Sequence, residues 1–136
     1  MKQIAIVSVF IICNNKLLIL KRSNQVATHR CLWAAISGYL ETDYPILQAY
    51  EEIREETAIS FRDLRLLCQA PPVQTQHLDS DIEWNIYAFL FAATKELPVS
   101  LNWENTDYAW VNVEHLDDYE TVPNLTNFLR RLLDMC

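Results

Sequence analysis

Glycine is the scarcest residue in this chain: it occurs once in 136 residues, at position 38. Phosphate-binding loops, dinucleotide-binding turns and nucleophile elbows each need several glycines, because their backbones turn tightly and approach a ligand closely. One glycine is too few to build any of them. These structures are therefore excluded as the basis of this protein's function.

Length and charge narrow the choice further. With 51% hydrophobic and 21% charged residues, the chain is expected to form a single globular domain over residues 1–136. Its formal net charge of −7 argues against a long nucleic acid as partner, because Lys and Arg supply most of that affinity. A small phosphorylated substrate stays compatible with this charge if metal ions and a few local cations neutralise it.

The first apolar run, Ile4 to Cys13, is too short to span a bilayer and ends in bulky residues instead of a cleavage site. Its β-branched residues predict a buried strand, and no membrane association is expected. Cys13, Cys31, Cys68 and Cys136 show no CxxC spacing. We therefore expect reduced thiols in a cytoplasmic protein, without a disulfide framework or a zinc site.

Apolar, β-rich runs alternate with polar stretches and turn residues along the chain. The runs predicted as strands are 3–13, 16–21, 31–36, 63–70, 81–93 and 108–113. Pro45, with Asp43 as its cap, is expected to begin a helix that continues through Thr57, and Pro123 to begin a second helix. Because strands and helices do not alternate strictly, this order predicts an α/β fold with a mixed sheet and helices on both faces.

The predicted helix at 45–57 combines an apolar stripe with a cluster of glutamates. The stripe recurs at helical spacing and consists of Ile46, Ala49, Tyr50, Ile53 and Thr57. The glutamates cover an arc of roughly 140° on nearly the opposite side; they are Glu51, Glu52, Glu55 and Glu56. We therefore expect their carboxylates to project together from the domain.

Two interpretations of this glutamate cluster stay open at the level of the helix. It is a solvated surface, although its two like-charge i,i+4 pairs each cost the helix a few tenths of a kcal/mol. Alternatively, it holds a divalent cation, since magnesium bridges carboxylates to substrate phosphates. A calcium loop of the EF-hand type is excluded, because the chain contains no DxDxDG pattern.

The residues around this helix resemble the Nudix box, GX5EX7REUXEEXGU. The matching parts are Gly38–Glu41 and Ala49–Ile59. Leu17–Arg22 is similar to the family's second strand, Trp33 to the aromatic that precedes the box, and Trp103–Val111 to a late segment ending in an aromatic and Val. The resemblance, with its parts in the family's order, implies a Nudix hydrolase with a Nudix-type α/β/α sandwich.

The same resemblance implies roles for individual residues. Glu52, Glu55 and Glu56 are the implied ligands of Mg²⁺, or of Mn²⁺, with the carbonyl of Gly38 as a further ligand. Either Glu55 or Glu52 is the expected base for the attacking water, and Glu104 is the alternative. Such metal ions offset phosphate charge and help to generate hydroxide near neutral pH.

The chain departs from the box pattern at four points. Glu51 stands at the position of the arginine, Ala58 at that of the later glycine, and Asp43 at that of the first internal glutamate. The stretch Gly38–Glu52 is also one residue shorter than in the pattern. These changes affect loop geometry and ligand orientation more directly than they affect the fold.

Several residues outside the box are candidates for binding substrate. Arg22, by resemblance, and Arg30 lie where cations would meet phosphates, although both also suit an ordinary surface. Trp33 and Trp84 can stack on a base, a contact worth roughly 1–3 kcal/mol, with core packing as the alternative. Glu104 is a further candidate for contact with the substrate.

The predicted function is Mg²⁺-dependent hydrolysis of a phosphoanhydride bond in a nucleoside diphosphate-linked substrate, such as a nucleoside triphosphate or a dinucleoside polyphosphate. The alternatives are a Nudix-like sensor that binds a nucleotide without turning it over, and an interaction module whose acidic helix is only surface. His29, His77 and His115 are isolated in the sequence and give no recognisable nucleophile–base arrangement. A homodimer is included among the expected partners.

Overall fold

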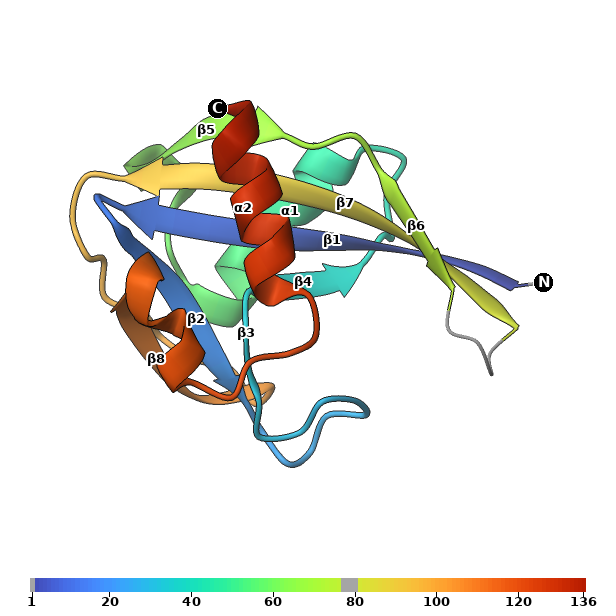
Figure 1. The fold of residues 1–136 in the computed structure, drawn as a ribbon, viewed down its shortest axis with the longest axis horizontal. Coiled ribbons are helices and arrows are strands. Elements are labelled where there is room, and N and C mark those ends of the chain that lie inside the picture. The colour runs from blue at the N-terminus through green and yellow to red at the C-terminus, as the bar shows by residue number, and fades with distance from the viewer. Residues whose placement is uncertain (1, 77–80) are drawn as a thin grey trace.

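A computed structural model describes residues 2–76 and 81–136 as one sheet between two helices (Figure 1). Two short 3-10 helices, η1 and η2, accompany the main elements. In chain order the elements are β1 (Lys2–Cys13), β2 (Lys16–Arg22), β3 (Trp33–Ala34), β4 (Ile36–Tyr39), α1 (Pro45–Thr57), η1 (Phe61–Asp63), β5 (Leu64–Gln69), β6 (Val73–Gln76), β7 (Ile82–Ala93), β8 (Asn105–Asn112), η2 (Val113–Asp118) and α2 (Leu125–Met135).

The two long central strands, β1 and β7, run parallel, with pairing from Lys2↔Ile82 to Ile12↔Ala92. The other strand pairs are antiparallel, so the sheet is mixed, as predicted. On its other edge, β1 pairs with two strands: its middle pairs with β4, and its C-terminal end at Ile12 and Cys13 pairs with β2. This division brings β4 and the turn that follows it up against α1.

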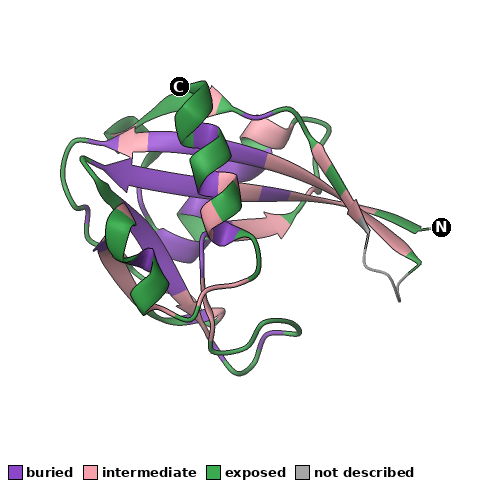
Figure 2. Ribbon diagram, in the orientation of Figure 1, coloured by how far each residue is buried: buried purple, intermediate pink, exposed green. Residues whose placement is uncertain are grey.

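Side chains alternate between the two faces of the sheet, and each face packs against one helix. Val7, Val9 and Ile11 pack with α1, whereas Phe10 and Ile12 pack with α2. Figure 1 shows α2 crossing in front of β1 and β7 with α1 behind them, and Figure 2 shows that the C-terminal halves of these two central strands are buried. The predicted α/β class with helices on both faces is confirmed.

The first helix has the predicted length, but its N-terminal cap differs from the prediction. It begins at Pro45 and ends at Thr57. The N-cap position is Tyr44, not Asp43, and no side chain caps the helix there. Instead the hydroxyl of Thr42 accepts from the backbone N–H of Tyr44 (3.1 Å) and donates to its carbonyl (2.9 Å). This local turn sets the entry to the helix, so the predicted aspartate cap was wrong.

Three further predictions of local structure were wrong. The single strand predicted at 31–36 is two short strands, β3 and β4, which pair with β2 and β1 respectively. The strand β6 occupies a stretch predicted as loop, because it pairs with the extended first half of β7. Helix α2 begins at Leu125 after an N-cap at Asn124 with φ 69°, so Pro123 precedes the helix. His77 lies outside the described residues.

The cysteines depart most clearly from expectation. Cys68 of β5 and Cys136, directly after α2, form a disulfide, while Cys13 is free and buried and Cys31 is free and exposed. The prediction of four reduced thiols was therefore wrong. The two partners are 68 residues apart, and the fold brings them together by laying α2 across the sheet next to β5. No helix among the described residues is long and apolar enough to cross a membrane.

Candidate active site

The four glutamates of α1 divide into an inner and an outer pair. Glu52 and Glu56 are 7% and 3% exposed, whereas Glu51 and Glu55 face solvent. The expectation that all four carboxylates project together was therefore wrong. One flank of the helix is covered by β4 and by the segment that leads into β8, and this cover takes in Glu52 and Glu56 while leaving the other two outside.

Glu52 is held between the end of β4 and its own helix. A Cβ added to Gly38 would overlap the Glu52 carboxylate, so the carboxylate occupies the space that a side chain would fill. This close approach explains why a glycine stands here, since Gly38 does not have a positive φ. The Nε2 of Gln48 donates to Oε1 of Glu52 over 3.0 Å, and this bond fixes the direction of the carboxylate.

Glu56 lies one turn further along, beside the start of β8. The Nδ2 of Asn105 donates to its Oε1 over 3.3 Å. Its second oxygen, Oε2, is buried without a hydrogen-bond partner. A buried carboxylate oxygen that lacks a partner costs free energy, and a cation can relieve that cost.

The inner carboxyl groups are perturbed in their protonation. Burial raises the pKa of Glu52 to about 7, and Glu55 and Glu104 add to the rise. Burial, followed by the charges of Glu104 and Glu52, raises the pKa of Glu56 well above its usual range. Ionising both carboxyl groups places two buried negative charges near each other, a state that burial disfavours.

This arrangement fits a divalent cation, which would balance the paired charges and contact the Oε2 of Glu56. Magnesium is commonly bound through one or two carboxylates together with substrate phosphates and water. Within 2–76 and 81–136, no three acidic, His or Cys side chains already converge as a metal cluster. The inner pair supplies the buried part of the donor set, and the assignment of Glu52, Glu55, Glu56 and Gly38 as ligands stays a prediction.

The outer pair is organised by Arg54. Its guanidinium forms a two-pronged hydrogen-bonded ion pair with Glu51 and lies 4.0 Å from Oε1 of Glu55. This pairing lowers the pKa of Glu51, while partial burial and then the neighbouring Glu51 raise that of Glu55. Glu51, at the position of the box arginine, therefore turns away from the inner carboxylates.

The two arginines predicted to bind phosphate, Arg22 and Arg30, lie at the end of β2 and in the loop that follows it. Arg22 ends β2 and pairs in the sheet with Asn105, which places its backbone beside the Glu56 end of the site. Its Nε donates to the carbonyl of Thr28 (3.0 Å). Arg30 lies in the following loop, where its Nε donates to the carbonyl of Val26 (2.8 Å). Both side chains thus help to order the loop between β2 and β3.

The two tryptophans predicted as candidates for stacking on a base, Trp33 and Trp84, lie on the α2 side of the sheet. Trp33 packs against that core and makes an edge-to-face contact with Tyr119, with ring centroids 5.2 Å apart. Trp84 sits in β7 opposite Thr75. The structure brings neither of them to Glu52 and Glu56, so the core-packing alternative applies to Trp33. Glu104, by contrast, directly precedes Asn105 and affects the pKa of both inner glutamates.

Two polar residues of the site were missed from sequence: Gln48 and Asn105. Both are buried, at 2% and 7% exposure, and both donate to an inner carboxylate. A weak signal existed for Gln48, which precedes Glu52 by four residues and adjoins the apolar stripe of the helix. Asn105 had no such signal, because its contact with Glu56 spans 49 residues and depends on the path of the loop before β8.

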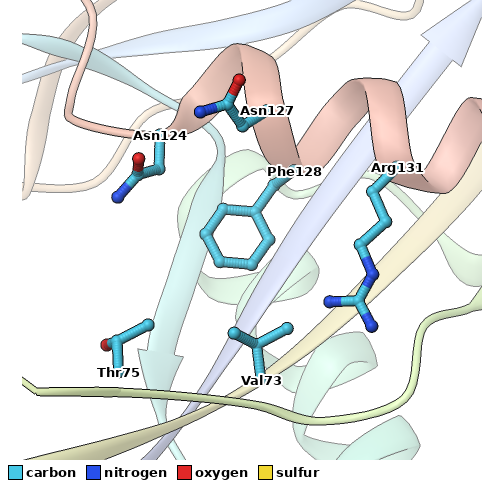
Figure 3. A pocket seen from close by; sticks show the side chains of 6 residues that line it. All are labelled: Val73, Thr75, Asn124, Asn127, Phe128 and Arg131. Atoms are coloured by element: carbon cyan, nitrogen blue, oxygen red, sulfur yellow. The ribbon is translucent and has the colours of Figure 1, made fainter.

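A separate cavity of about 280 Å³ lies between α2 and β6. Figure 3 shows the ring of Phe128 between Asn124 and Arg131, facing Val73 and Thr75 across the opening, and Asn127 also lines it. It lies on the α2 side of the sheet, whereas the inner glutamates belong to α1. An aromatic ring, two amides and a guanidinium around one opening suit a planar polar ligand.

The end of α1 yields a stability prediction. Ala58 caps the helix with φ 58°, a left-handed conformation that disfavours any residue with a Cβ. We expect Ala58→Gly to raise the free energy of unfolding by up to about 1 kcal/mol and to leave activity unchanged. Ala58→Val, as the opposite control, should lower it. Urea denaturation measures both, and a destabilised glycine variant would contradict the argument.

In this structure a mixed sheet lies between two helices, and the acidic helix α1 packs against β4 at the chain's one glycine, Gly38. A family model described as the NUDIX domain matches residues 2–133. The chain belongs to the NUDIX domain family. The predicted family, fold class and Nudix-type enzyme class are thereby confirmed at the level of the family. Comparison with curated proteins gives no significant match.

Solved structures support the same fold. The chain is similar to RenU, a Nudix hydrolase from M. smegmatis (14% identity, 98% of this chain and 84% of that one covered, TM-score 0.78). It is also similar to a MutT protein from Methanosarcina mazei Go1 (23%, 98% and 95%, TM-score 0.75). A third similar structure is the E. coli dihydroneopterin triphosphate pyrophosphohydrolase (16%, 97% and 96%, TM-score 0.77). At these identities the likeness concerns the fold.

Proposed function

We propose that this protein hydrolyses a phosphoanhydride bond in a small nucleotide-like substrate, with Mg²⁺ or Mn²⁺ as cofactor. The observation that carries the proposal is the pair of buried, adjoining carboxyl groups of Glu52 and Glu56, one of which has an oxygen without a partner. Burying two such groups is costly for a fold, and a divalent cation that binds phosphates offsets the cost.

Glu52 and Glu56 would hold the metal, with the carbonyl of Gly38 and the carboxylate of Glu55 as further ligands. When bound, the cation offsets phosphate charge and lowers the pKa of a bound water. Glu55 has an exposed side chain whose Oε1 lies 4.0 Å from the guanidinium of Arg54. This exposure to solvent supports Glu55 as the base for the attacking water, with Glu52 and then Glu104 as alternatives.

The substrate proposal is limited to its phosphorylated, nucleotide-like part. Similar structures are described as acting on different compounds, among them an Ap4A hydrolase from C. elegans and the E. coli enzyme for dihydroneopterin triphosphate. A bifunctional NMN adenylyltransferase/ADP ribose pyrophosphatase from Francisella tularensis, 42% of which is covered, is described in complex with AMP and a Mn ion. We propose that Arg22, whose backbone pairs with Asn105 beside the Glu56 end of the site, contacts phosphate.

A sensor that binds a nucleotide without turnover is the second candidate. The observation in its favour is the outward direction of Glu51 and Glu55, held near Arg54. A similar NUDIX domain, from NrtR of Shewanella oneidensis, is described in complex with ADP ribose.

The cytoplasmic location and the homodimer stay predictions. Disulfides as a rule persist in oxidising compartments, so the Cys68–Cys136 bond argues against a cytoplasmic location.

Metal and substrate are tested together by thermal melting and a turnover screen. We expect Mg²⁺ to raise the melting temperature, because a ligand that binds only the native state stabilises it by about 2.7 kcal/mol at a hundred times its Kd. Phosphate release from a library of nucleoside triphosphates, dinucleoside polyphosphates and nucleotide sugars should then identify the substrate. Melting unaffected by millimolar Mg²⁺, with and without nucleotide, would remove the metal site. Binding without turnover throughout the library would favour the sensor.

A further inference from the structure

Gln48 is a buried glutamine whose amide is hydrogen-bonded at both ends. It lies on α1 one turn before Glu52 and is 2% exposed. Its Nε2 donates to Oε1 of Glu52, and its own Oε1 accepts from the backbone N–H of Glu41, each over 3.0 Å. A buried amide is costly unless its polar atoms are paired, so this position requires a side chain of this length and polarity.

The two bonds connect parts of the site that are otherwise separate. Glu41 lies in the turn between β4 and α1, three residues after Gly38. The carboxylate of Glu52 fills the space above Gly38, so its remaining freedom is rotation about its last bonds. Gln48 restricts that rotation from the helix and, through Glu41, holds the turn at the same time. The turn and the carboxylate are therefore fixed relative to each other by one side chain.

We propose that Gln48 is a positioning residue for metal binding, a role that rests on the proposed function. Its neutral amide orients an ionised carboxylate without neutralising it, whereas a Lys or Arg at this position would compete with the cation. The link also suits a stretch Gly38–Glu52 that is one residue shorter than the box pattern, because a turn of different length needs fixing contacts of its own. Glu51, which replaces the pattern's arginine, is instead paired with Arg54.

The rival interpretation is that Gln48 only satisfies the N–H of Glu41 and stabilises the fold. The two roles predict different measurements. Loss of a structural contact lowers the melting temperature and leaves the metal affinity of the folded protein unchanged. Loss of a positioning contact weakens metal binding in protein that is still folded, since partners that orient a ligand typically contribute 10–100-fold in affinity or activity.

The test measures Mn²⁺ binding to the substrate-free protein, monitored by electron paramagnetic resonance well below the melting temperature. Gln48→Met keeps the length of the side chain and removes both hydrogen bonds; Gln48→Ala, a good helix former, is the second variant should the first not fold. Gln69→Met makes the same chemical change at an exposed position of β5 and is the control. We expect Gln48→Met to bind Mn²⁺ about tenfold more weakly and the control to match the wild type.

Kinetics supply the second measurement. In the Gln48 variants the Mg²⁺ concentration for half-maximal activity should rise by the same factor, with the KM for substrate at saturating Mg²⁺ unchanged. Mn²⁺ affinity within twofold of wild type in folded Gln48 variants would overturn the proposal. Glu56→Gln separates the levels of failure: if it too binds Mn²⁺ normally, the metal site itself is wrong, whereas if it alone loses binding, only the role of Gln48 is wrong.

Discussion

Glu56→Gln is expected to abolish turnover and, in the absence of metal, to stabilise the fold. Turnover on the best substrate should fall by about a hundredfold or more, because metal-assisted attack supplies several kcal/mol of transition-state stabilisation. Stability should rise because glutamine is an uncharged analogue of the acid and removes a buried charge close to Glu104 and Glu52. Such a result would show that the buried carboxyl group of Glu56 lowers the stability of the metal-free fold.

The gain depends on pH in a defined direction. Glu52 and Glu56 have pKa values above the unfolded value near 4.5, Glu52 at about 7 and Glu56 well above its usual range. Between pH 4.5 and these values the folded state binds more protons than the unfolded state, so the free energy of unfolding falls as pH rises. Metal-free wild type should thus be more stable at pH 5 than at pH 8. Glu56→Gln should show a flatter profile and its full gain at pH 8.

Glu51→Gln is the matched control, because it makes the same chemical change on the same helix at a solvent-facing position. It removes the ion pair with Arg54, and such solvent-exposed pairs contribute little to stability. Turnover should stay near that of wild type. Urea titrations at pH 5 and pH 8 with EDTA, and kcat/KM across a Mg²⁺ titration, measure both properties. Turnover within threefold of wild type in Glu56→Gln would contradict its place among the metal ligands.

Loss of the Cys68–Cys136 disulfide is expected to produce the largest change in stability. The bond closes a loop with a sequence separation of 68 residues, for which the chain-entropy relation gives about 4 kcal/mol. Cys136→Ser, or reduction of the wild type, should therefore lower the melting temperature by on the order of 10 °C. The effect should be insensitive to Mg²⁺, because both cysteines lie away from the glutamates of α1.

Two comparisons make the disulfide prediction specific. Cys68→Ser and Cys136→Ser should cost the same, and the double variant should cost no more than either single one, since each removes the same bond. Cys31→Ser, at an exposed free thiol, should leave the melting temperature unchanged under both oxidising and reducing conditions. A melting temperature of wild type that does not respond to a reductant would show that the bond is absent or contributes nothing.

The sequence was a good guide where structure follows from local pattern. The helix at 45–57 has a proline at its first position and an apolar stripe, and both its ends were predicted correctly. Between β1 and β2 the chain turns at Asn14 with φ 55°, a conformation that asparagine tolerates. The strands β3, β4 and β6 could not be delimited, because two to four residues carry no periodicity and their pairing partners lie elsewhere in the chain.

The site shows the same limit. The box pattern implies Glu52, Glu55 and Glu56 as ligands, but the position of a carboxylate on the helix cannot tell which of them a neighbouring segment will cover. That depends on where β4 and the loop before β8 lie, as the buried bonds of Gln48 and Asn105 show. The disulfide was missed for a related reason: spacing rules describe cysteines that are close in sequence, whereas Cys68 meets Cys136 only through the placement of α2.

The parallel pairing of β1 with β7 has a consequence for how the chain reaches its fold. Every ladder contact between them joins residues about 80 positions apart, from Lys2↔Ile82 onward. During synthesis, the apolar strand β1 therefore emerges long before the strand that covers its edge, and a chain stopped before residue 82 would keep that edge unpaired. Pairing between residues this far apart in sequence slows folding and prolongs the exposure of an aggregation-prone apolar strand. The rate of folding and the dependence on chaperones should therefore be determined by the formation of the β1–β7 pairing.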